Sequence, residues 1–145
     1  MSRLRSRCGA LLAATAVLAG ATPAAAAARI VSFSSPSTNI GCQMFQANHY
    51  WIARCDIRDR DWPNPKRPRR CRLDYGQGVY VSGRGGRGAY VCAGDTALGA
   101  KRILGYGHAL RRGTILCTSL TTGMRCVNVR DGHGFLISRE TVKRF

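Results

Sequence analysis

Histidine is the first candidate for chemistry in this chain, because imidazole titrates near neutral pH and can act as an acid or a base. The chain has three histidines, and His133 stands between two glycines. Flanking glycines allow unusual backbone conformations and let a ligand approach closely. With His108 and Asp95, His133 would supply the groups for general acid–base cleavage of a polymer such as RNA. One hypothesis is therefore a small secreted hydrolase or nuclease that uses His133.

Each of these candidates also has a simpler structural explanation, which we favour. Asp131 and Gly132 are typical of a turn, in which His133 would bond only locally. Asp95 precedes Thr96 and would cap a helix or order a turn through side-chain to backbone bonds. The chain has neither Gly-x-Ser-x-Gly nor His-Glu-x-x-His, and it has a single glutamate. The sequence therefore favours a protein that is not an enzyme, and it predicts no cofactor.

The densest positive charge lies in a short segment with prolines, residues 66–72, which we call the basic segment. It holds five cations: Lys66, Arg67, Arg69, Arg70 and Arg72. Arginine binds phosphate or carboxylate in bidentate geometry, and the preceding Trp62 would add a surface for stacking. These six residues are the candidate ligand-binding residues. The alternative is a solvated loop that has no partner.

The first 28 residues have the three parts of a secretory signal peptide: arginines at the start, an apolar run over residues 9–20 and small residues up to Ala28. The apolar run is too short to span about 30 Å of hydrocarbon, which needs about 20 residues. We expect cleavage after Ala28, which leaves residues 29–145 as one exported domain. No later segment is apolar enough to span a membrane.

The charge of the exported part favours an anionic partner. The chain has 23 basic and 7 acidic side chains, and the signal removes three arginines, so 20 against 7 remain, a net charge of +13. Such an excess favours nucleic acid, cell-wall polymer, lipid headgroups or an acidic protein. Arginine greatly outnumbers lysine, however, and part of the charge is equally typical of a GC-rich genome.

Six cysteines follow the signal and predict disulfides, because export delivers the chain to an oxidising compartment. Polar turn residues lie midway between the first two and between the last two, which predicts two hairpins whose cysteines face each other. The middle two are then left to pair. No spacing matches a zinc site, so no metal is predicted. The expected bridges join neighbours in sequence: Cys42 with Cys55, Cys71 with Cys92, and Cys117 with Cys126.

Short apolar stretches, broken by turn residues at intervals of about ten, predict an all-β fold, a small disulfide-rich barrel or sandwich. Prolines predict an extended loop over residues 62–68. Residues 95–101 are expected as a helical turn or a loop, and residues 138–145 as a strand end or a short helix. Residues 54–59 resemble residues 125–131, which indicates a duplicated hairpin or chance. The expected extended segments are 30–33, 39–45, 50–57, 78–82, 88–93, 103–107, 114–119, 124–129 and 134–138.

An ordered set of motifs resembles a known family. The set includes Ser35-Pro-Ser-x-Asn-Ile-Gly-Cys42, Arg54-Cys-Asp-Ile57, Cys92-Ala-Gly-Asp-Thr96, Leu104-x-Tyr-Gly107, Cys117-Thr-Ser119 and Gly132-His-Gly-Phe-x-Ile-Ser-Arg139. In this order the motifs resemble a family of small secreted actinobacterial domains of unknown function. The resemblance implies an exported, disulfide-linked domain and implies no activity. The basic segment lies outside these motifs, so a function that rests on it would belong to this chain rather than to the family.

The leading hypothesis from the sequence is an exported, non-catalytic protein that binds an anionic polymer or an acidic protein, at the cell envelope or outside the cell. The enzyme that uses His133 is the alternative. A third hypothesis is a proteinaceous enzyme inhibitor, because disulfide-locked loops resist proteolysis and can enter active sites. The sequence indicates no oligomeric state.

Overall fold

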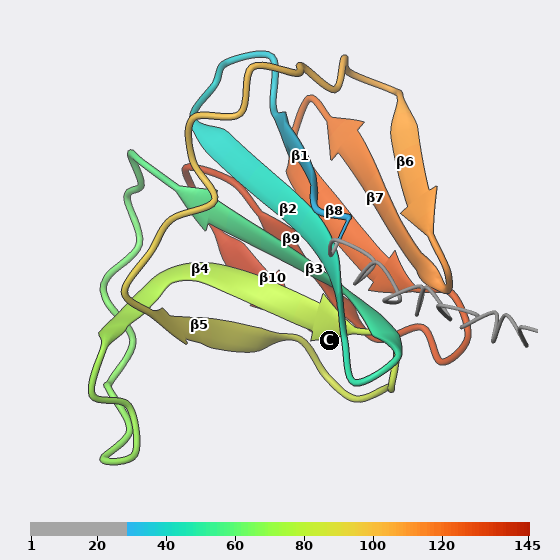
Figure 1. Ribbon diagram of the computed structural model, residues 1–145. Helices are drawn as coiled ribbons and strands as arrows, with labels where there is room; N and C mark the ends of the chain where they lie inside the picture. Colours follow the sequence, from blue (N-terminus) through green and yellow to red (C-terminus); the bar gives the residue numbers. More distant parts are fainter. Residues whose placement is uncertain (1–28) are drawn as a thin grey trace, which may run out of the picture.

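The computed structural model describes residues 29–145, which form two five-stranded antiparallel sheets packed face to face (Figure 1). The first sheet contains, in spatial order, β1 (Val31–Ser34), β2 (Ile40–Ala47), β3 (Tyr50–Ile57), β4 (Asp74–Ser82) and β5 (Ala89–Ala93). The second contains β6 (Ala109–Arg112), β7 (Ile115–Leu120), β8 (Gly123–Asn128), β9 (Gly134–Ile137) and β10 (Val142–Arg144). The all-β prediction is confirmed, and the architecture is a sandwich rather than a closed barrel.

Most of the expected strands are present, and the differences have local causes. No strand is predicted over residues 109–112, where β6 lies, because Leu110 is its only buried residue and the apolar alternation is missing. The extended segment expected at residues 103–107 is reduced to an isolated bridge between Ile103 and Ser34. Residues 95–101 are a loop rather than a helical turn, and residues 138–145 contain β10 rather than a short helix.

The predicted signal peptide lies outside the described residues. Within residues 29–145, no helix has the length and apolar character that a membrane crossing requires.

All three predicted disulfides are formed, and local turns explain two of them. In the hairpin of β2 and β3, Asn48 and His49 both have positive φ angles, 49° and 67°, as a two-residue type I′ turn requires. The hairpin of β7 and β8 also turns over two residues, 121 and 122. Each turn places two cysteines directly opposite, with Cα–Cα distances of 4.1 and 4.0 Å. The bridges are Cys42–Cys55, Cys71–Cys92 and Cys117–Cys126.

The two sheets repeat one pairing register. Successive partners across β1–β5 are Phe33, Cys42, Cys55, Val79 and Tyr90. Successive partners across β6–β10 are Leu110, Cys117, Cys126, Phe135 and Arg144. The first four of each row are buried, and the Sγ atoms of Cys55 and Cys126 lie 3.9 Å apart, so two disulfides meet in the core. The similarity between residues 54–59 and 125–131 therefore belongs to a structural repeat of five strands.

Candidate functional site

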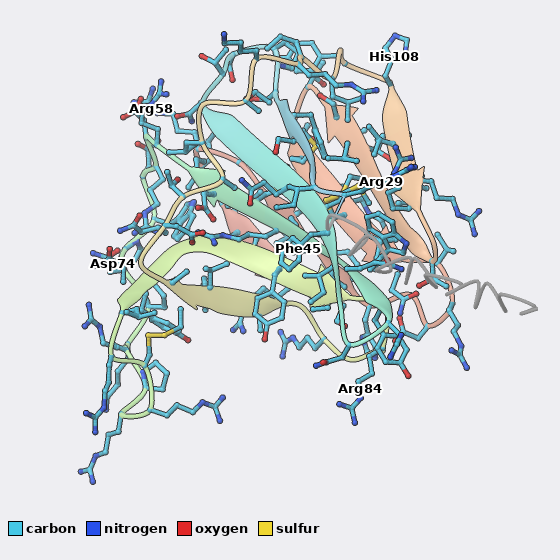
Figure 2. The ribbon with its side chains drawn as sticks, in the orientation of Figure 1. Arg29, Phe45, Arg58, Asp74, Arg84 and His108 are labelled. Atoms are coloured by element: carbon cyan, nitrogen blue, oxygen red, sulfur yellow. A yellow bond between two sulfur atoms is a disulfide. The ribbon has the colours of Figure 1, made fainter. Side chains whose placement is uncertain are left out.

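The basic segment lies in the longest connection of the sandwich. Residues 58–73 join β3 to β4, whereas residues 129–133 alone join the equivalent strands β8 and β9. Connections longer than about 12–15 residues without secondary structure are uncommon, and they are usually either functional or linker segments. In Figure 2 the light-green part of this connection projects from the sheets at the lower left, with its side chains spread into solvent. The segment is therefore an addition to one half of the repeat.

The cations of the basic segment have no ion-pair partner in residues 29–145, and the backbone of the segment is anchored to the fold. All five of its cations are exposed, and none of them makes an ion pair with any other residue in 29–145. The half-buried Pro68 accepts a hydrogen bond from the backbone of Cys71 at 2.9 Å. Cys71 is buried, and its disulfide to Cys92 ties the segment to β5. The basic segment is therefore a positively charged projection that a disulfide holds in place where it joins the sheet.

Trp62 lies apart from this projection. Its indole N–H donates to the backbone carbonyl of Ser138 at 3.0 Å, and the guanidinium of Arg60 covers its ring at 3.9 Å from the centroid. Next to it, Asp61 donates its backbone N–H to the carbonyl of Arg139 at 2.8 Å, and the two side chains pair at 3.4 Å. Trp62 therefore anchors the start of the connection on the second sheet, and one face of its ring is already covered.

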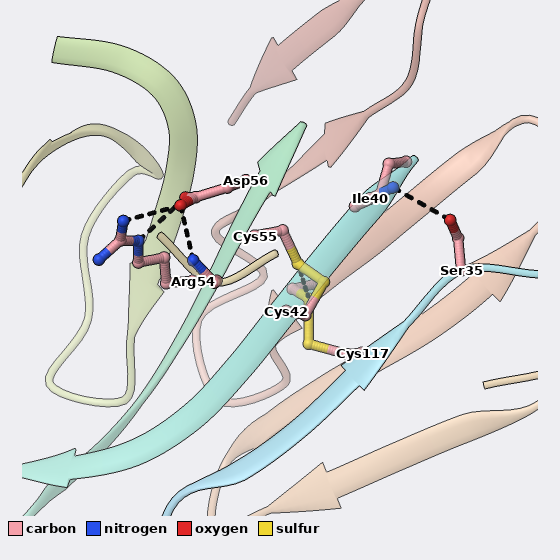
Figure 3. The surroundings of a disulfide bond; sticks show 9 residues. Ser35, Ile40, Cys42, Arg54, Cys55, Asp56 and Cys117 are labelled. Carbon is pink, nitrogen blue, oxygen red and sulfur yellow. Dashed lines mark hydrogen bonds and ion pairs between the residues drawn. A yellow bond between two sulfur atoms is a disulfide. The ribbon is translucent and has the colours of Figure 1, made fainter. Parts of the chain in front are cut away.

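Asp95 belongs to an ion cluster on the outer face of the first sheet, part of which is drawn in Figure 3. Arg54 donates to both carboxylate oxygens of Asp56, at 2.9 and 2.7 Å, and to Oδ1 of Asp95 at 2.7 Å. Asp56 is buried, and its Oδ2 also accepts the backbone N–H of Ala97 at 2.9 Å and the hydroxyl of Thr96 at 3.2 Å. The cluster thus holds the loop after β5 onto β3.

Hydrogen bonds within the cluster shift the pKa values of Arg54 and Asp95. Burial alone would lower the pKa of Arg54, but hydrogen bonds with Asp56 and Asp95 outweigh it and raise the pKa above its usual value. The hydrogen bond from Arg54 holds the pKa of Asp95 below its usual range. Asp95 is therefore ionised at neutral pH and cannot give up a proton as a general acid. The side chain of Asp95 is held by an ion pair with Arg54 of β3, and the hydroxyl of Thr96 accepts the backbone N–H of Leu98 at 3.1 Å, as expected for an ordered turn.

His108 and His133 lie at opposite ends of the second sheet. His108 precedes β6, and its backbone carbonyl accepts the N–H of Ser119, whereas His133 precedes β9, and its backbone carbonyl accepts the N–H of Asn128. Asn128 pairs with Ile115 of β7, which is four residues, or about 13 Å, from Ser119 along that strand. Across the sheet, β6 and β9 are three strands apart, or about 14 Å. Asp95 lies on the other sheet. The three candidates for acid–base catalysis therefore do not share a site.

His133 is an exposed residue of a turn. Oδ1 of Asp131 accepts its backbone N–H at 3.0 Å, and Gly132 has a φ of 77°. This hydrogen bond is the main reason why the pKa of Asp131 is below its usual range. No three His, Cys, Asp or Glu side chains in the described part of the chain lie close enough together to hold a metal ion.

A cavity with both polar and apolar lining, which we call the end hollow, lies among the connections at one end of the sandwich. It has a volume of about 320 Å³ and is bounded by five connections. They contribute residues 35–39, Asp59, Tyr106, residues 121–122 and residues 138–140. Sequence reasoning missed this cavity because its lining comes from segments up to a hundred residues apart. The only available signal was that three of the quoted motifs supply part of it.

A second hollow, of about 400 Å³, lies on the outer face of the first sheet. It is mainly apolar, with Phe45, Ile52, Tyr80 and Val91 among its lining residues. Figure 2 shows Phe45 pointing outward from β2. Cys92 also lines this hollow, so the disulfide places the base of the basic segment beside it.

Comparison with known proteins places the chain in a family. A family model described as a family of unknown function (DUF6636) matches residues 10–145. The chain belongs to this family. No curated protein and no solved structure matches it. Membership confirms the resemblance to a family of unknown function, and it assigns neither an activity nor a ligand to the features described above.

Proposed function

We propose that this protein is an exported, non-catalytic binding protein whose basic segment contacts an anionic polymer at the cell envelope or outside the cell. The observation that carries the proposal is the basic segment of the projecting connection 58–73: its five cations are exposed and have no ion-pair partner in residues 29–145. Unpaired arginines are available for bidentate contacts with phosphate or carboxylate.

The anchoring of the segment supports the same function. A free loop must be ordered when it binds, which weakens binding, and a loop that is already constrained loses less entropy. The disulfide Cys71–Cys92 supplies such a constraint at the base of the basic segment. Three disulfides also support export, because such bonds persist mainly in oxidising compartments.

The competing hypotheses have less support in the structure. The hydrolase or nuclease that uses His133 lacks an assembled acid–base site among residues 29–145. The inhibitor hypothesis would use the same projecting connection, and inhibition of a panel of secreted proteases tests it. Binding through charge requires only the exposed cations, and it therefore explains the most with the fewest assumptions.

The test is binding of the oxidised protein to a short DNA duplex as a defined polyanion, measured by fluorescence anisotropy between about 50 and 200 mM salt. The variant replaces Arg67, Arg69 and Arg70 with Ser. A matched control loses the same charge elsewhere, through Ser at Arg84, Arg102 and Arg130, which are exposed on other connections. Each lost phosphate contact lowers the slope of log K against log salt by about 0.9, so the segment variant is expected to lose about 3.

Equal losses in the two triple variants would contradict the proposal, because they would show that only net charge matters. A polyglutamate probe distinguishes carboxylate from phosphate partners. Unchanged urea unfolding curves confirm that the exposed substitutions leave the fold intact.

A further inference from the structure

We propose that the end hollow is a second binding site, and that it takes a neutral saccharide. The site is separate from the basic segment and does not depend on the function proposed above. Its lining combines hydroxyl groups, carboxylates and one exposed aromatic ring, contributed by five connections that meet at one end of the sandwich. Loops that a rigid β-sandwich presents together at one end are a common place for binding sites.

The walls of the end hollow are held in place before any ligand arrives. The side-chain amide of Asn39 exchanges two hydrogen bonds with the backbone of Asp59, at 2.8 and 2.9 Å. The buried hydroxyl of Ser35 accepts the backbone N–H of Ile40 at 3.2 Å. The buried hydroxyl of Ser138 accepts the backbone N–H of Thr141, also at 3.2 Å. A ligand therefore meets a cavity of fixed shape and loses little affinity to ordering.

The polar groups at the mouth of the end hollow can form further hydrogen bonds. Among residues 29–145, none donates a hydrogen bond to the carboxylate of Asp59, and the hydroxyls of Thr121, Thr122 and Tyr106 have no side-chain partner. The carboxylate of Glu140 accepts a side-chain hydrogen bond from Ser138 at 2.9 Å. Carboxylates accept only, whereas hydroxyls both donate and accept. This combination suits a ligand that is itself dense in hydroxyl groups.

Tyr106 adds a flat apolar surface beside these polar groups. Its side chain is 50 % exposed at the rim of the end hollow. A tyrosine ring offers an apolar face and a polar tip. A pyranose ring has matching chemistry, because one face carries C–H groups and the edge carries hydroxyls. The ring and the polar groups together therefore favour a sugar over a purely polar ion.

The local charge argues against an anionic ligand, although the chain as a whole is strongly basic. Asp59 and Glu140 both line the end hollow. The cation in the lining, Arg139, is paired with Asp61 at 3.4 Å. An anion would meet two carboxylates there, and like charges repel. The end hollow therefore selects against the polymers that the basic segment attracts, and it favours a neutral saccharide over an anionic one.

The test is titration of the oxidised protein with maltohexaose, cellohexaose and N-acetylchitohexaose, followed by two-dimensional NMR of the backbone amides and by calorimetry. At least one oligosaccharide is expected to bind saturably, with shifts confined to the five connections. Tyr106→Ala and Asp59→Asn are each expected to weaken that binding about tenfold or more. Tyr80→Ala, which removes another exposed tyrosine on the outer face of the first sheet, is the matched control and should leave it unchanged.

The absence of binding to all three oligosaccharides up to about 10 mM, well above the Kd of a weak site, would overturn the proposal. Equal weakening by Tyr106→Ala and Tyr80→Ala would also overturn it. DNA binding by the basic segment is measured on the same samples. A negative result with sugars leaves that measurement unaffected, so the two proposals fail or hold separately.

Discussion

The two sheets of this protein share one register but differ in the residue that follows the central cysteine. That residue is Asp56 in β3 and Val127 in β8, and each lies opposite a glycine of the next strand. A Cβ on Gly78 would lie 2.1 Å from Oδ1 of Asp56, and one on Gly134 would lie 2.2 Å from the carbonyl oxygen of Cys126. Both glycines are thus required by close contacts, so the repeated backbone constrains them alike.

The two sheets differ in what the arginine before the central cysteine contacts on the outer face. In the first sheet, Asp56 and Arg54 hold the loop after β5 against β3 through buried ionic hydrogen bonds. In the second sheet, Arg125 occupies the place of Arg54, and its guanidinium lies 5.2 Å from the ring centroid of Phe145. The comparison teaches that equivalent arginines on the two outer faces do different work: Arg54 holds a distant loop through ionic hydrogen bonds, whereas Arg125 makes a cation–π contact.

The sharpest test of this comparison replaces the two equivalent arginines. Arg54→Ala leaves the buried carboxylate of Asp56 without its partner, and we expect a loss of about 3–5 kcal/mol in the free energy of unfolding. Arg125→Ala removes only a cation–π contact, worth about 0.5–1 kcal/mol. Urea unfolding of both variants measures the difference. Similar losses would show that the ion cluster contributes no more than its counterpart.

The core disulfides are expected to contribute equally to stability, which tests the symmetry of the repeat. The bridges Cys42–Cys55 and Cys117–Cys126 close sequence separations of 13 and 9 residues. The corresponding loss of unfolded-state entropy predicts about 3 kcal/mol for each bridge. Unfolding of the two double Cys→Ala variants, compared under non-reducing conditions, provides the measurement. A twofold difference between them would mean that the two halves of the core are not equivalent.

Acid is expected to weaken the first sheet through Asp95. Its folded-state pKa is lowered by Arg54, so its stabilising contribution is present above the unfolded value of about 3.9 and is lost as the pH falls through the lower folded value. The effect is small because the side chain is 76 % exposed and solvent screens the pair. Stability curves of the native protein and of Asp95→Asn should differ at neutral pH and converge in acid. Parallel curves would contradict this assignment.

The smallest expected effect concerns a polar atom of the second sheet. Ser119 takes the register position that Met44 holds in the first, and its hydroxyl is the one buried side-chain polar atom in residues 29–145 without a hydrogen-bond partner. A buried hydroxyl without a partner is destabilising. Ser119→Ala should therefore raise the free energy of unfolding by up to about 1 kcal/mol. A loss of stability on calorimetric unfolding would show that the hydroxyl is satisfied, for example by water.

Local chemistry made much of the fold predictable. Asn48 and His49 form a turn that few residue types tolerate, and this turn alone sets the register of β2 and β3. The facing cysteines and their disulfide follow from that register. The segment β6 escaped prediction because a single buried residue, Leu110, carries its packing. The role of Trp62 escaped it because its partner, Ser138, follows β9 of the other sheet, 76 residues along the chain.

The sequence by itself determined two hairpins, the disulfides Cys42–Cys55 and Cys117–Cys126 within them, and the exposed charge of the basic segment, since each depends on residues that are close along the chain. Only the tertiary structure decided that Asp95 pairs with Arg54, that the histidines lie apart and that five connections enclose the end hollow. The physical reason is that these arrangements depend on how two sheets pack. Packing is set by the shape of the whole core, which no short stretch of sequence contains.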